Sequence, residues 1–153
     1  MPRARRIRAP SWCRQGQRGS ALIETALVLP ILLTLAFGLV GVARVAHARM
    51  GLSAVAREEA RVGALADTPG DATTRGLAAG QAVASGYDLG NGSLQLSVDP
   101  GALDRGGQVM ATAAYTVHLG DLPLMHWVDI PLKSQHVERI DLYRSRWNEA
   151  AGS

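Results

Sequence analysis

The longest apolar stretch of the chain runs from Thr25 to Ala43 and holds 19 residues without a charged side chain. As a helix this stretch would extend about 28 Å, close to the hydrocarbon thickness of a bilayer. A buried helix of a soluble protein is usually shorter and apolar on one side only. The pattern therefore predicts a membrane-spanning helix. Pro30 lies inside it, and membrane helices tolerate proline better than exposed ones do.

Helical spacing continues beyond this span and then stops at a turn. Alanines recur after Arg44, with apolar residues on one face, which predicts that the helix continues through Ala66. The sequence Asp-Thr-Pro-Gly at 67–70 is typical of a helix end. A second, shorter helix is expected from Asp71 to Gly86.

After Tyr87 the apolar residues alternate with polar ones instead of following helical spacing. The alternation predicts one strand from Leu94 to Asp99 and a longer one from Val109 to Leu119. We expect an irregular apolar loop at 120–131 and a third strand within 132–142. Two helices followed by a small antiparallel sheet of about three strands, which can pack on a helix face, define the α+β class.

Charge divides the chain at Gly19. Six of the 16 basic residues and none of the acidic ones lie in 1–19. The remaining residues, 20–153, therefore have 16 − 6 = 10 basic and 13 acidic side chains, a net charge of −3. A basic cluster before an apolar span directs the N-terminus to the cytoplasm. The acidic balance of the remainder argues against nucleic-acid binding. Residues 1–19 contain no acid and six arginines: Arg3, Arg5, Arg6, Arg8, Arg14 and Arg18.

These patterns divide the chain into five expected regions. They are a basic cytoplasmic leader at 1–19, a transmembrane helix at 20–43, an extramembrane helical region at 44–86, a small β-rich region at 87–146 and a flexible tail at 147–153.

Glu24 stands at the start of the apolar span, where a carboxylate is costly and usually has a partner. Cleavage after Gly19 would create an α-amine on Ser20, whose pKa of about 8 keeps it protonated at neutral pH. At a spacing of four residues, this amine can approach the Glu24 carboxylate of its own helix or of a neighbouring subunit. We interpret Gly19 and Ser20 as a processing site and Glu24 as a residue for peptidase recognition or subunit registry. The plainer alternative is an acid tolerated at the membrane boundary.

The segment around these residues resembles the TadE/TadG-like pseudopilins of tight-adherence (Flp-type) pilus systems. The matching residues are Arg18–Glu24, Ala26–Pro30, Arg44 and Ala56–Arg61. The family usually has phenylalanine where this chain has Thr25, and it tends to have glycine where Glu59 stands.

The resemblance implies a minor pseudopilin or pilus-assembly protein in the inner (cytoplasmic) membrane. It implies a single pass with the N-terminus in the cytoplasm and the C-terminal domain periplasmic or extracellular. Its implied partners are the prepilin peptidase and other pilin-like subunits.

Two other classes of protein remain open. A secreted protein would be cut near Ala46–Ala48, although the apolar region is longer than a usual signal core and carries Glu24. A single-pass anchored binding domain would keep its leader. We expect no enzyme, cofactor or small-molecule substrate, because nucleophile and nucleotide motifs are absent from the sequence. No metal site is expected either, because the four histidines lack ligand spacing: His47, His118, His126 and His136.

Overall fold

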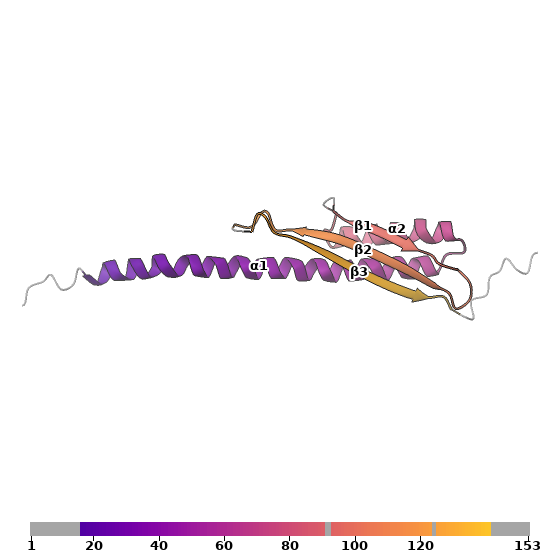
Figure 1. The fold of residues 1–153 in the computed structure, drawn as a ribbon, viewed down its shortest axis with the longest axis horizontal. Coiled ribbons are helices and arrows are strands. Elements are labelled where there is room, and N and C mark those ends of the chain that lie inside the picture. The colour runs from indigo at the N-terminus through magenta and orange to yellow at the C-terminus, as the bar shows by residue number, and fades with distance from the viewer. Residues whose placement is uncertain (1–15, 91–92, 124, 142–153) are drawn as a thin grey trace, which may run out of the picture. The chain divides into compact units, whose positions relative to one another are not determined.

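The computed structural model describes residues 16–90, 93–123 and 125–141. It contains two helices followed by a three-stranded antiparallel sheet, in the order β1-β2-β3 (Figure 1). This arrangement confirms the predicted α+β class. The elements are α1 (Gly16–Ala64), α2 (Pro69–Gly86), β1 (Gln95–Asp99), β2 (Gln108–His118) and β3 (Asp129–Arg139).

The chain forms two compact units, Met1–Leu39 and Val40–Ser153. In the described part of the first unit, the large apolar side chains of α1 are exposed, with Leu22 and Leu39 both at 72%. The helix runs through Pro30 without a break. A helix with leucines exposed in this way buries almost nothing within its own unit. It therefore requires an apolar surrounding.

In the second unit, the apolar side of the sheet and the rest of α1 build the core. Inward-facing residues of β2 such as Val109 and Ala111 are fully buried, as are Val55 and Ala60 of α1. The predicted alternation of β2 is confirmed by its burial pattern. β1 and β3 flank β2, so that the sheet has two edge strands.

Helix α2 packs with small residues. Its buried positions recur every four residues, at Ala72, Gly76, Gly80 and Ala84. Residues four apart lie on one side of a helix, so this stripe lets α2 approach its neighbours closely. Thr68 caps the helix, because its side chain accepts a hydrogen bond from the Asp71 backbone nitrogen at 3.2 Å.

Several predicted boundaries were wrong. Helix α1 ends at Ala64 instead of Ala66. Its described part begins at Gly16, and the leader boundary at Gly19 stays a prediction about cleavage. Helix α2 begins at Pro69, because proline fits the first turn of a helix, where its missing N–H is not needed.

The start of the third strand was also placed too late. Strand β3 begins at Asp129, within the segment predicted as a loop, and it includes Pro131. β3 is an edge strand, where a proline is tolerated because one side of the strand needs no ladder hydrogen bonds.

Candidate membrane-anchoring and processing site

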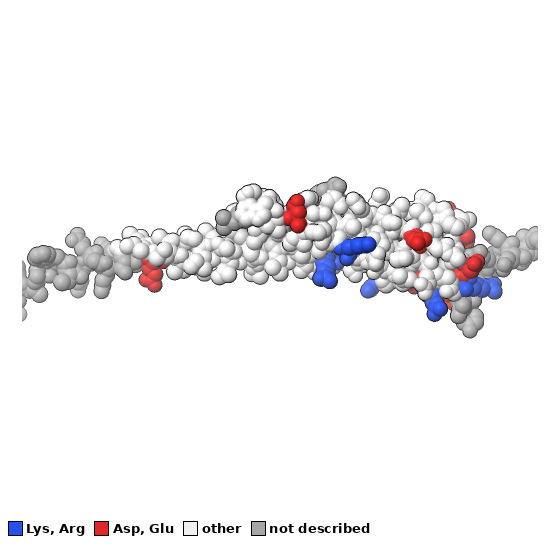
Figure 2. All heavy atoms as spheres, viewed as in Figure 1, with Lys and Arg blue, Asp and Glu red and all other residues white. Residues whose placement is uncertain are grey.

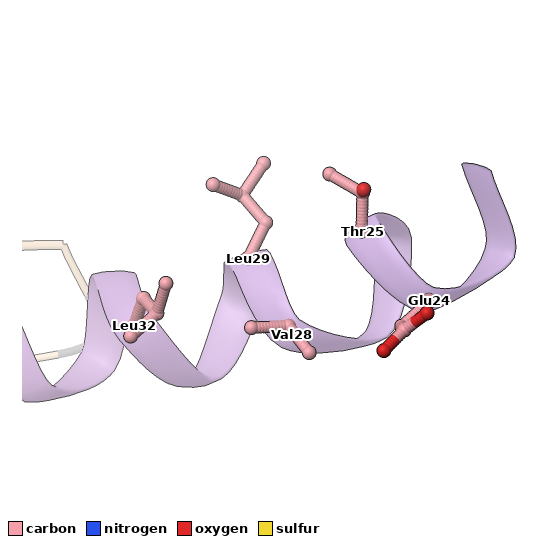
Figure 3. Close-up of a pocket in the computed structure, with 5 residues that line it drawn as sticks. All are labelled: Glu24, Thr25, Val28, Leu29 and Leu32. Carbon is pink, nitrogen blue, oxygen red and sulfur yellow. The ribbon is translucent and has the colours of Figure 1, made fainter. Parts of the chain in front are cut away.

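Glu24 lies on α1 with its side chain exposed on the helix surface. Together with Thr25, Val28, Leu29 and Leu32 it lines a shallow hollow (Figure 3). The carboxylate projects away from the helix backbone, and no hydrogen bond or ion pair is found for it among the described residues. Glu24 is therefore available to a group outside this unit.

Hydroxyl groups near Glu24 are satisfied by the helix itself. Thr25 donates from its side chain to the Ala21 carbonyl at 2.8 Å, and Thr34 donates to the Pro30 carbonyl at 2.8 Å. A hydroxyl that already donates a hydrogen bond to the preceding turn of its helix adds little to the free-energy cost of placing that helix in an apolar surrounding. Glu24 differs from these threonines, because its carboxylate has no hydrogen-bond partner among the described residues of this apolar surface.

Gly19 and Ser20, the predicted processing residues, are helical in the described chain. Gly19 is exposed, and a Cβ added to it would meet nothing within 4 Å. Arg18 is helical as well. The other predicted topology residues lie outside the described residues: Arg3, Arg5, Arg6, Arg8 and Arg14.

The second unit begins with a buried glycine and an ion pair on α1. A Cβ at Gly41 would lie 3.4 Å from Met125 Sδ, so the segment between β2 and β3 packs directly on α1 at this point. One turn further, Arg44 bonds Asp121 of the same segment, with 2.6 Å between the nitrogen and the oxygen. The hydrogen bond from Arg44 lowers the pKa of Asp121 below its usual value.

Glu59 was not singled out as a functional residue, although it is the most unusual acid in the second unit. Its side chain is 0% exposed, and neither carboxylate oxygen has a hydrogen-bond partner among the described residues. Burial raises the pKa of Glu59 to about 7. The side chain lies against Gly80 of α2, where a Cβ would come within 2.7 Å of its Cδ.

A signal for this burial exists in the sequence. Glu59 continues the spacing of Leu52, Val55 and Ala56, which places it on the apolar face of the helix. Its neighbour Glu58 instead pairs with Arg61 at 3.3 Å near the surface. The two neighbouring acids therefore lie on different sides of the helix, Glu58 near the solvent and Glu59 in the core.

The four histidines have separate neighbours. The His47 ring lies 5.7 Å from the Tyr87 ring, and His118 Nδ1 lies 2.7 Å from an Asp129 oxygen. His136 is 3.5 Å from Glu138, and His126 contacts the Trp127 ring edge-on. Within the described ranges, no three His, Cys, Asp or Glu side chains lie close enough together to hold a metal ion.

Taken together, these features define an α+β protein whose first helix is long and apolar enough to cross a membrane, by its length and composition. Charged side chains gather on the second unit, while the described part of the first is almost free of them (Figure 2). Residues 19–61 match the family model described as TadE-like protein. The match confirms the predicted resemblance over this part of α1. No curated protein and no solved structure matches the chain.

Proposed function

We propose that this protein is a minor pseudopilin or pilus-assembly protein of a tight-adherence (Flp-type) system. In this proposal α1 inserts in the inner membrane, a prepilin peptidase cuts between Gly19 and Ser20, and the trimmed helix associates with pilin-like subunits. The leader arginines hold the N-terminus in the cytoplasm. The domain after Arg44 supplies contacts outside the membrane.

One observation carries the proposal. Glu24 heads an exposed apolar helix, five residues after Gly19, inside the segment that matches the TadE-like family model. An acid at that position gains a partner when cleavage frees the amine of Ser20, because an opposite charge offsets the cost of keeping a carboxylate away from water. The exposed apolar surface that flanks Glu24 supports association with similar helices or with lipid.

The first test is the N-terminus of the mature protein in its native host, read by intact mass and terminal sequencing. A chain that starts at Ser20 supports the proposal. A chain that starts near Arg49 indicates secretion with a signal peptide, and an uncut chain indicates a single-pass anchored domain.

Variants sharpen this test. We expect Gly19→Val to stop cleavage, because a branched side chain replaces hydrogen at the residue whose carbonyl would be attacked. Gly38→Val is the matched control, since a Cβ at either glycine meets nothing within 4 Å. Equal loss of processing in both variants would point to a general effect on the helix.

The carboxylate is tested separately from cleavage. Glu24→Ala and Glu24→Gln remove the charge that would pair with the amine of Ser20. We expect both variants to insert in the membrane but to fail in pilus assembly. Normal pili from either variant would exclude the proposed role of Glu24.

A further inference from the structure

The segment between β2 and β3 is folded into a compact loop. We use the name interface loop for residues 119–123 and 125–128. Its ends are joined by a bond from the Leu119 nitrogen to the Val128 carbonyl at 3.1 Å. Inside it, the Leu122 nitrogen bonds the Leu119 carbonyl at 3.0 Å, and the Met125 nitrogen bonds the Leu122 carbonyl at 3.1 Å. The loop therefore presents its side chains from a defined backbone.

This loop contacts the end of the apolar run of α1. A Cβ at Gly41 would lie 3.4 Å from Met125 Sδ, 3.6 Å from Leu119 Cδ1 and 3.8 Å from Leu122 Cδ1. Gly41 precedes by two residues Ala43, the last residue of the uncharged run. The side chains that pack on Gly41 thus stand beside the part of α1 that would leave the membrane.

The length of the helix places that contact at a membrane boundary. The uncharged run from Thr25 to Ala43 extends about 28 Å as a helix, which is close to the hydrocarbon thickness of a bilayer. This step rests on the proposed membrane insertion of α1. If Thr25–Ala43 fills the hydrocarbon layer, then Gly41 lies two residues from its outer end, about 3 Å along the helix, and the interface loop that packs on Gly41 lies at that edge.

The exposed groups of the loop suit that position. Trp127 is 69% exposed, although its indole is one of the largest apolar groups in the chain. The His126 ring meets it edge-on, with 4.4 Å between ring centres. The Arg44–Asp121 pair joins the same loop to α1. Indole rings collect at membrane–water interfaces, because one side is apolar and the N–H prefers water or headgroups.

We propose that the interface loop lies in the lipid headgroup layer, with the indole of Trp127 inserted among the lipids. The loop then acts as a second contact with the membrane and holds the extramembrane domain against the bilayer surface. The binding partner is the lipid interface itself.

The test places a single reporter tryptophan in the full-length chain. The sequence has three tryptophans, so Trp12→Phe and Trp147→Phe leave Trp127 alone. The protein is reconstituted in vesicles of phosphatidylethanolamine and phosphatidylglycerol that carry lipids brominated at different depths. We expect a blue-shifted emission and a loss of intensity that is larger for bromines near the headgroup than for bromines near the chain ends.

A matched control moves the reporter to the other end of the sheet. Val137 on β3 is 48% exposed and lies about 26 Å along the strand from Asp129. At that end, Arg139 lines a hollow with Arg61, which stands far beyond Gly41 along α1. In a chain that carries Trp12→Phe, Trp127→Phe and Trp147→Phe, the reporter Val137→Trp should show no quenching by brominated lipid.

The outcomes separate this inference from the proposed function. Extraction at alkaline pH reports whether α1 is inserted in the same vesicles. An inserted chain whose Trp127 is quenched by acrylamide and not by lipid would overturn the inference and leave membrane insertion standing. A Trp127 shielded from both quenchers would overturn it in favour of a protein contact. A chain that is not inserted would overturn both.

Discussion

Glu59 is a carboxylic acid enclosed by backbone and apolar groups. Among the described residues, no charged side chain pairs with it, and burial raises its pKa from the ordinary value of 4.5 to about 7. The charged residues of α2, Asp71 and Arg75, are exposed, and Glu58 pairs with Arg61. On the inner face of β3, His136 lies beside Glu138. The acid is therefore held in its neutral form below neutral pH.

A pH dependence of stability follows from this burial. Because the folded-state pKa is raised, the contribution of Glu59 is fully present below pH 4.5 and is lost as the pH rises through about 7. Over that range the free energy of unfolding should fall by about 3 kcal/mol, at roughly 1.4 kcal/mol for each pKa unit. Denaturant unfolding of the full chain in detergent, at intervals between pH 4.5 and 8.5, measures this fall.

Two variants test whether Glu59 causes the slope of the free energy of unfolding against pH. Glu59→Gln should flatten it, because an amide of similar shape does not ionise, and at pH 8 this variant should be more stable than the parent. Glu58→Gln, at the half-buried neighbouring position, should keep the parent's slope. If both variants keep it, another group is responsible.

The sequence could identify Glu24 but not the state of Glu59. Glu24 stands out because its surroundings are apolar in the sequence itself. The enclosure of Glu59 depends on Gly76 and Gly80, which come from another helix. The helical spacing of Glu59 indicates an inward position, but spacing alone does not show whether a hydrogen-bonding or oppositely charged group lies beside it.

At the scale of elements, the close packing of α2 depends on hydrogen atoms at its glycines. A Cβ at Gly80 would lie 2.5 Å from Glu59 Cγ and 2.7 Å from Cδ. A Cβ at Gly76 would lie 3.1 Å from the Glu59 carbonyl oxygen and 3.1 Å from Val98 Cγ2. Side chain and backbone of Glu59 therefore both meet α2 where it has no side chains.

This packing makes Gly80→Ala destabilising despite the better helix propensity of alanine. Overpacking typically costs about 1–3 kcal/mol, while the propensity gain offsets at most about 1 kcal/mol. Gly86→Ala is the control within the same helix, because its Cβ would meet nothing within 4 Å. Thermal unfolding should show a lower midpoint for Gly80→Ala and an unchanged or higher midpoint for Gly86→Ala.

A double-mutant cycle checks the physical cause. If Glu59 is what the new methyl group meets, then Gly80→Ala should lose most of its cost in a Glu59→Ala background. Additive effects of the two substitutions would contradict the contact and assign the cost to β1 or the helix backbone.

Elements were predictable wherever one period dominated the apolar pattern. The alternation of β2 and the turn before α2 both predicted the observed elements. β3 was harder, since none of its residues is fully buried and its burial only alternates between exposed and intermediate. Its first residues are polar or proline mixed with apolar, and such a mixture is equally typical of a loop. These residues form a strand because they pair with β2, where Ile130 lies opposite Val117.

At the scale of the whole molecule, apolar residues form a buried core in the second unit, whereas in the described part of the first unit they form an exposed surface. In the described chain, every buried hydrophobic residue lies between Ala48 and Ile140, in the second unit. The large side chains from Leu22 to Leu39 are mostly exposed. The sequence predicted this division from the length of the uncharged run. It could not predict the contact at Gly41, because that contact joins residues about 80 positions apart.

This division predicts that the second unit folds without the first. A fragment of residues 40–153 retains the whole described core, including α2 and the sheet, and keeps Gly41 for the interface loop. Because the removed helix contributes no buried core residue, the fragment should unfold cooperatively, with a midpoint close to that of the full chain.

It should also stay in solution without detergent, whereas the full chain needs a membrane or detergent to cover its leucines. Circular dichroism melting and size-exclusion chromatography measure both properties. A fragment that shows no cooperative transition would mean that the apolar helix stabilises the domain directly, and α1 would then have to be treated as one structural element from Gly16 to Ala64.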